Sequence, residues 1–173
     1  MKKTLPLLLS AALLLAGLTA CADKPVQETE RTPEEWTTLY SDAITAGRSE
    51  EENEYYPVMT SNEDDLFTMT LETMGLTEED MTAFAISASM MNVQAYAVAA
   101  VKPAEGREET VTSALQTYVD NTKASFEFYL PGPFEVASNA RLETLEDGTV
   151  LLVMCEDQDT VFDSISAQIL GEA

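Results

Sequence analysis

The sequence predicts an α+β domain with a four-stranded antiparallel sheet, in the order ββαββα, with packed helices and an additional N-terminal helix. Two pairs of strand-like segments, at residues 83–101 and 141–155, are each joined by a turn too short for a parallel crossover. A long amphipathic segment separates the two pairs, and a shorter one follows the second pair. Paired strands interrupted by helices are typical of a sheet with helices packed on it.

The N-terminal helix is predicted from Pro33 to Gly47. Thr32 is a suitable N-cap, Pro33 suits the first helical position, and Glu35 completes a capping box. One apolar stripe runs along the segment: Trp36, Leu39, Tyr40, Ala43 and Ile44. Residues 48–54 carry five charges and no apolar period, so we interpret them as a solvated loop.

The next segments predict a short helix, a turn and the first strand pair. The helix opens near Ser61 and ends before Gly75, and residues 77–80 form a capped turn. Residues 83–90 alternate, and after a turn at 91–94 a second strand covers 95–101. The apolar positions are Leu66, Met69 and Met74 in the helix, Phe84, Ile86, Ala88 and Met90 on one strand face, and Tyr96 and Val98 opposite a face of alanines in the second strand.

The second half of the chain predicts a long helix, a hairpin and a last helix. The long helix covers about residues 105–129 and stops at Leu130-Pro131-Gly132-Pro133. Asp147-Gly148 predicts a tight turn, and Asp157 caps the last helix. The apolar stripes of the two helices are Val111, Leu115, Tyr118, Thr122 and Phe126, and Val161, Phe162, Ile165 and Ile169.

Residues 150–155 are apolar at every position, which predicts a central strand that is covered on both faces. The helix that contains Trp36, or a partner protein, is expected to supply the second cover.

The first residues have the layout of a bacterial lipoprotein signal peptide. Lys2 and Lys3 precede an apolar run, and residues 18–21 read Leu-Thr-Ala-Cys, a lipobox. An ordinary secretory signal with a chance cysteine, or an uncleaved membrane helix, is the alternative. The apolar stretch of residues 5–20 spans roughly 24 Å as a helix, which is shorter than a bilayer core of about 30 Å.

The sequence therefore predicts a signal peptide at 1–20, a flexible tether at 21–31 and a single α+β domain at 32–173. Cys21 is the predicted lipidation site, where diacylglycerol would anchor the protein to the lipid bilayer. Cys155 would then be the one remaining thiol, expected to be a small buried apolar side chain rather than a nucleophile.

Charge and composition exclude several functions. The 173 residues include 31 acidic and 9 basic ones and no histidine, for a formal charge of −22. Such a field repels phosphate backbones, so no nucleic acid partner is expected. The absence of histidine removes Ser/His and Cys/His nucleophilic pairs and histidine-bearing zinc sites. Weak, non-specific binding of divalent cations is expected from charge density alone.

The sequence indicates no catalytic residue, no cofactor and no metal site. Carboxylates are abundant, at 78–80 and at 108–109 for example, but nothing places two of them across a cleft. Two calcium-loop candidates, at 62–67 and 157–162, carry Phe67 and Phe162 where the loop needs glycine. None of the seven glycines forms a phosphate-binding loop.

The segment around the end of the long helix is the best candidate for a contact surface. It holds Phe126, Phe128, Tyr129 and Phe134 close to a Pro-Gly-Pro sequence. Phe126 and Tyr129 are expected in the core, and Phe128 and Phe134 are the candidate exposed contact residues. Burial of all four in a minor core is the alternative.

The chain resembles a family of bacterial envelope lipoproteins known as domain of unknown function 4358, most clearly between Asp80 and Pro131. The resemblance is carried by Met90-Met91-Asn92-Val93, by the strand at 95–102, by Ser125 to Pro131 and by the final hairpin and helix, and it covers roughly residues 32–170. The family often has an acidic residue where this chain has Tyr96. The resemblance implies a Gram-positive envelope lipoprotein on the outer face of the cytoplasmic membrane, and transfers no catalytic residue.

The leading functional hypothesis is a non-catalytic, membrane-anchored module that binds another envelope protein or an envelope ligand. A carboxylate-dependent enzyme acting on the cell wall and a structural lipoprotein without a specific ligand are the alternatives. A facing pair of buried carboxylates would favour the enzyme, and an exposed apolar patch would favour the binding module.

Overall fold

The computed structural model describes residues 31–64 and 66–172, which belong to a compact unit that begins at Arg31. The predicted signal peptide, Cys21 and the tether up to residue 30 lie outside the described residues. The elements are α1 (Pro33–Gly47), α2 (Glu50–Tyr55), α3 (Phe67–Met74), η1 (Glu78–Asp80), β1 (Met81–Ala88), β2 (Ala97–Pro103), α4 (Glu108–Phe126), α5 (Pro131–Ser138), β3 (Arg141–Thr144), β4 (Val150–Met154) and α6 (Gln158–Leu170).

The four strands form one antiparallel sheet in the order β1-β2-β4-β3. This arrangement confirms the predicted α+β class. Strand β4 lies between β2 and β3, with Leu152 opposite Ala99 on one side and Leu142 on the other. All five residues of β4 are buried, as their unbroken apolar run predicted.

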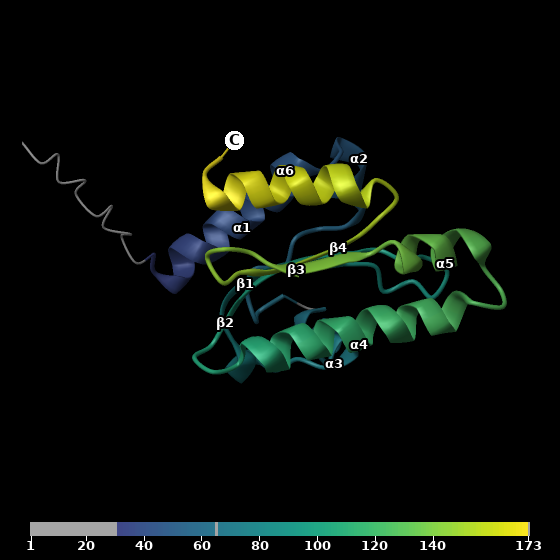
Figure 1. The fold of residues 1–173 in the computed structure, drawn as a ribbon, viewed down its shortest axis with the longest axis horizontal. Helices are drawn as coiled ribbons and strands as arrows, with labels where there is room; N and C mark the ends of the chain where they lie inside the picture. The colour runs from purple at the N-terminus through teal and green to yellow at the C-terminus, as the bar shows by residue number, and fades with distance from the viewer. Residues whose placement is uncertain (1–30, 65, 173) are drawn as a thin grey trace, which may run out of the picture. The chain divides into compact units, whose positions relative to one another are not determined.

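Helices cover both faces of the sheet (Figure 1), so the second cover of β4 comes from within the chain. Helices α1 and α6 pack together on one face, while α3 and α4 lie on the other. Gly47 permits the close approach of α1 to α6, because a Cβ at this position would lie 2.5 Å from Ile165 Cγ1. The α1/α6 side of the core includes Tyr40, Ile44, Val98, Leu151 and Phe162, and the α3/α4 side includes Phe67, Leu71, Ile86, Leu115 and Leu152.

Helix α1 begins and ends as its sequence predicted. Glu35 N–H donates to Thr32 Oγ1 over 3.3 Å, and Thr32 N–H donates to Glu35 Oε2 over 2.8 Å, so the capping box is complete. The hairpin at Asp147-Gly148 and the stripe of α6 are also confirmed. Asp157 precedes α6, but its side chain makes no capping bond.

Two predicted irregular segments are helical. Residues 48–54 were expected to be a solvated loop, which is wrong, because Ser49 and Glu52 form a capping box that starts α2. The proline segment after α4 was expected only to end a helix. Pro131 instead occupies the first turn of α5, where its missing N–H costs nothing.

Some predicted burials are also wrong. Helix α4 ends at Phe126, so Tyr129 lies beyond it and is 83% exposed rather than in the core. In α3 the buried face is formed by Phe67, Thr70, Leu71 and Met74, while Leu66 and Met69 are exposed.

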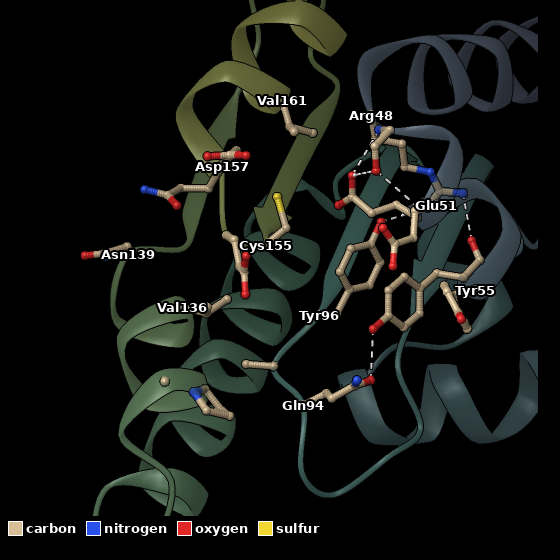
Figure 2. Close-up of a pocket in the computed structure, with 18 of the residues that line it drawn as sticks. Arg48, Glu51, Tyr55, Gln94, Tyr96, Val136, Asn139, Cys155, Asp157 and Val161 are labelled. Carbon is tan, nitrogen blue, oxygen red and sulfur yellow. Dashed lines mark hydrogen bonds between the residues drawn. The ribbon is translucent and has the colours of Figure 1, made fainter.

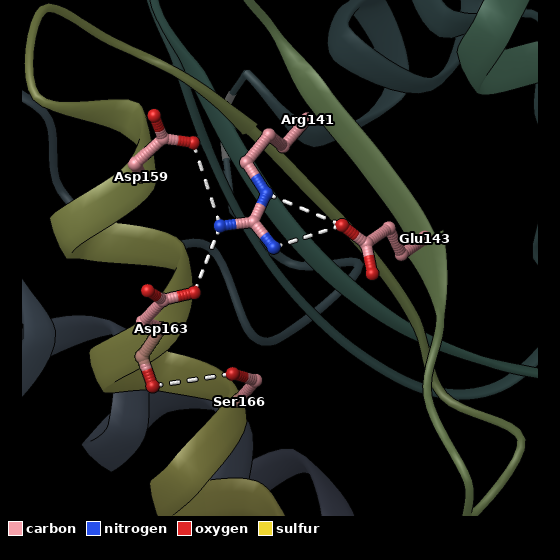
Figure 3. Close-up of polar contacts among 5 residues, drawn as sticks. All are labelled: Arg141, Glu143, Asp159, Asp163 and Ser166. Carbon is pink, nitrogen blue, oxygen red and sulfur yellow. Dashed lines mark hydrogen bonds and ion pairs between the residues drawn. The ribbon is translucent and has the colours of Figure 1, made fainter.

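Arg141 on the outer strand β3 connects the sheet to α6 (Figure 3). Its guanidinium pairs with Glu143 and Asp163 at 2.8 Å each, and with Asp159 at 3.5 Å. It also lies 3.9 Å from the centre of the Phe162 ring. These contacts hold β3 and α6 together at the edge of the sheet.

Candidate functional site

A groove of about 1070 Å³ is lined by the end of α1, by α2, by the β1–β2 connection, by α5 and by the segment that leads from β4 into the first turn of α6. We call it the acidic groove. Figure 2 shows Arg48, Glu51, Tyr55, Gln94 and Tyr96 on one side of it, and Val136, Asn139, Cys155 and Asp157 on the other. Among the described residues, five carboxylates line it: Glu51, Glu52, Glu135, Glu156 and Asp157.

Arg48 holds one wall of the acidic groove in place. Its side chain is only 9% exposed, and its nitrogens donate to four acceptors: Asn53 Oδ1 at 2.6 Å, Ser87 Oγ at 2.7 Å, Tyr96 Oη at 2.8 Å and the Tyr56 carbonyl at 2.7 Å. These acceptors are neutral, and no ion pair within the described ranges involves Arg48. Its hydrogen-bonding capacity is therefore used to join the ends of α1 and α2, strand β1 and the residue that precedes β2, rather than to meet a ligand.

Two tyrosines form the aromatic part of the same wall. The rings of Tyr56 and Tyr96 stack, with centroids 3.8 Å apart and planes 14° apart. Tyr56 Oη donates to Gln94 Oε1 over 2.9 Å, which fixes the tip of its ring. Burial raises the pKa of Tyr96 to about 12 against the lowering effect of Arg48, so Tyr96 carries its proton at neutral pH.

Carboxylates from both sides of the acidic groove raise the pKa of the same side chain, Tyr56. The pKa of Tyr56 is raised by burial first, and then by the negative charges of Glu52, Glu156 and Glu51. Glu51 and Glu52 belong to α2, whereas Glu156 follows β4. Their fields therefore converge on the groove from opposite sides, which produces a negative potential there.

Cys155 lies in the acidic groove but is poorly suited to be a nucleophile. Its side chain is 3% exposed, which confirms the predicted burial. Burial raises the pKa of its thiol to about 12, and the charge of Glu52 adds to this effect. The thiolate, which is the reactive form, is therefore scarce at neutral pH.

A smaller, apolar depression continues from the acidic groove. We call it the methionine hollow; its volume is about 290 Å³, and Met59, Leu66, Met90 and Met91 are among its lining residues. Tyr55, Tyr56 and Met91 line both depressions. Several large apolar side chains that line one or both depressions are exposed to solvent: Tyr55, Leu66, Met90, Met91 and Val93.

The two predicted contact residues do not lie in either depression. Phe128 is 81% exposed, as expected, just after α4. Phe134 was expected on an exposed loop, which is wrong: it lies in α5, half-buried against the core. Its ring lies 5.6 Å from Lys123 Nζ. Its neighbours Glu135 and Val136, rather than Phe134, line the acidic groove.

One carboxylate outside the acidic groove is buried. Asp80 is the one buried carboxyl group among residues 31–64 and 66–172, and it lies outside both depressions. It accepts hydrogen bonds from Thr77 Oγ1 at 2.7 Å and Thr77 N–H at 2.9 Å, which lower its pKa. Within the described chain no three histidine, cysteine or carboxylate side chains are grouped to hold a metal ion. Among residues 31–64 and 66–172, the helices lack the combination of length and apolar character that a membrane-spanning segment requires.

The family model described as "Domain of unknown function (DUF4358)" matches residues 56–155, which is more than half of the chain. The chain belongs to the DUF4358 family. The match is narrower than the expected 32–170, since it leaves out α1, α2 and α6. No curated protein and no solved structure matches this chain.

The DUF4358 segment contains only part of the acidic groove. Tyr56, Tyr96 and Cys155 lie inside the matched residues, whereas Arg48, Glu51 and Glu52 precede them and Glu156 and Asp157 follow them. None of these groove residues was predicted from the sequence to be a contact residue. One local signal was available, the Ser49-x-x-Glu52 capping box, which would have predicted α2.

Proposed function

We propose that this member of the DUF4358 family is a membrane-anchored, extracytoplasmic binding module that does no chemistry on its ligand. In this proposal diacylglycerol on Cys21 holds the protein on the outer face of the cytoplasmic membrane of a Gram-positive bacterium. The acidic groove and the methionine hollow together bind another envelope protein.

The observation that carries this proposal is the exposed apolar surface beside the groove. Met91 and Val93 are each more than half exposed in the β1–β2 connection, and Tyr55 faces the same groove from α2. Exposed apolar side chains clustered at a concave, polar-rimmed site are typical of protein interaction surfaces. Methionine is common on such surfaces because its flexible thioether adapts to different partners.

The carboxylates argue for binding over hydrolysis. A carboxylate-dependent hydrolase needs two facing carboxyl groups with different environments, one of which is protonated. The five carboxylates of the acidic groove are exposed or half-buried, and the buried Asp80 lines neither depression. Their arrangement suits electrostatic attraction of a ligand.

Photocrosslinking in the native envelope tests the binding role. A photoreactive residue in place of Val93 should form a discrete adduct with one protein, because this side chain lies on the binding surface. The same residue in place of Asn121, which is exposed on α4 outside both depressions, is the matched control. Equal labelling from both positions, or none from Val93, would favour a structural lipoprotein without a specific ligand.

Anchoring is tested separately. Cys21→Ser should release the protein into the medium or leave it unprocessed, because the thioether to diacylglycerol cannot form. Normal cleavage with unchanged membrane association would contradict the anchoring role.

A further inference from the structure

We propose that the partner docks through a basic amphipathic segment, with its apolar side chains in the methionine hollow and its Lys or Arg side chains over the acidic groove. This inference rests on the proposed function and names the chemistry of the occupant.

The size of the site favours a polypeptide over a small molecule. The acidic groove alone has a volume of about 1070 Å³, and the methionine hollow continues it by about 290 Å³. Sites for small ligands span about 300–1,000 Å³ and enclose most of the ligand. A larger, two-part site matches an extended or helical segment that uses several side chains.

The charge of the acidic groove selects a cationic occupant. Its five carboxylates come from α2, from α5 and from the β4–α6 connection, so they surround the site rather than cluster on one element. Among the described lining residues Arg48 is the one cationic side chain, and its four hydrogen bonds are made within the protein. An acidic or nucleic acid segment would be repelled here, whereas Lys and Arg side chains would be attracted.

The two depressions divide the recognition between them. The described residues that line the methionine hollow are mainly apolar, including Met59, Leu66 and Met90, and Asp64 is the carboxylate among them. Tyr55 and Tyr56 line both depressions, and the exposed ring of Tyr55 can contact either an apolar side chain or a cation. A segment with adjoining apolar and basic faces can contact both the methionine hollow and the acidic groove, whereas a simple polyamine can contact only the acidic groove.

The test uses the full chain in a non-ionic detergent and three synthetic peptides with the same helical pattern. One peptide pairs leucine with lysine, the second replaces lysine by glutamate, and the third replaces leucine by serine. Fluorescence anisotropy should show binding of the Leu/Lys peptide, and at least about tenfold weaker binding of the other two, because each lacks one of the two matching faces.

Matched variants locate the binding. Glu51→Gln with Glu156→Gln removes two groove charges, and Glu108→Gln with Glu109→Gln removes two exposed charges outside it. Met91→Gln changes the hollow, and Met69→Gln is its control, since both side chains are 53% exposed and only Met91 lines the site. The groove and hollow variants should weaken binding about three- to tenfold, and the controls less than about twofold.

Equal weakening by both Glu pairs would mean that the overall charge alone attracts the peptide, and would overturn the inference. An unchanged affinity of the Leu/Lys peptide for the Met91→Gln variant would also overturn it. If spermidine in addition displaced the peptide fully, a small amine would be the indicated occupant. If any of these results came with a specific crosslinked adduct at Val93, the binding role would stand and only the basic amphipathic partner would be refuted. The absence of an adduct at Val93 would refute the binding role itself.

Discussion

Arg48 Nη1 donates a hydrogen bond of 2.8 Å to Tyr96 Oη, which belongs to a residue 48 positions further along the chain. The same nitrogen donates to Ser87 Oγ, and Nη2 donates to the Tyr56 carbonyl. One guanidinium thus joins the end of α1 to the segment after α2, to β1 and to the residue that precedes β2. The wall of the acidic groove depends on this side chain.

Replacement of Arg48 by methionine should lower the free energy of unfolding by about 2–4 kcal/mol, because buried acceptors lose their charged donor. Tyr96→Phe removes one acceptor and should cost about 1 kcal/mol. Urea unfolding measures both. Arg107→Met is the control, since its side chain is 46% exposed and should cost less than about 1 kcal/mol. Equal losses for the two arginine variants would show that Arg48 does not hold the wall.

The four aromatic residues around the end of α4 should separate into two classes. Phe126→Ala should cost about 3–5 kcal/mol, because Phe126 is fully packed in the core. Phe128→Ala and Tyr129→Ala should stay within about 0.5 kcal/mol of the unchanged protein, since both side chains are exposed. The loss of stability for Phe134→Ala should lie between these two values, because this side chain is half-buried. Chemical denaturation of the four variants checks the order, and a loss at Phe128 as large as at Phe126 would contradict it.

Alkaline pH should destabilise the protein through Cys155. The folded state raises the pKa of this thiol from 9.0 to about 12, so the unfolded chain ionises first as the pH rises. The stability that the neutral thiol contributes is complete below pH 9.0 and is lost towards pH 12, by up to about 1.4 kcal/mol per pH unit. Cys155→Ala should flatten the dependence between pH 9 and 10, before the tyrosines contribute. An unchanged slope in urea titrations would contradict the role of the thiol.

Added salt should raise the melting temperature. The chain has a formal charge of −22, and repulsion within the compact domain is screened over a Debye length of about 10 Å at 0.1 M ionic strength. Magnesium and calcium chloride at matched ionic strength should give similar shifts in a circular dichroism melt. A saturating, stoichiometric shift with micromolar calcium would reveal a specific site and contradict weak, non-specific cation binding.

The elements with a clear local pattern were predictable from the sequence. The capping box at Thr32 and Glu35, the turn at Asp147-Gly148 and the apolar run of β4 each depend on neighbouring residues, and each is present in the structure. Helix α5 was missed because Pro131 was interpreted as the end of one helix when it is the start of another. Proline is compatible with both, so tertiary packing decides between them.

The sequence by itself determined the fold class, the central place of β4 and the excess of negative charge, because periodicity, turn chemistry and composition are local or additive properties. The tertiary structure decided the site. Arg48, Tyr56, Tyr96 and Glu156 meet at the acidic groove from four separate segments, and no local pattern relates them. Arg48 lies in a charged segment of the kind that is usually exposed to solvent. In the folded protein, however, its guanidinium donates to the buried side chains of Ser87 and Tyr96. Its burial is favourable only because those acceptors are already held in place by the fold.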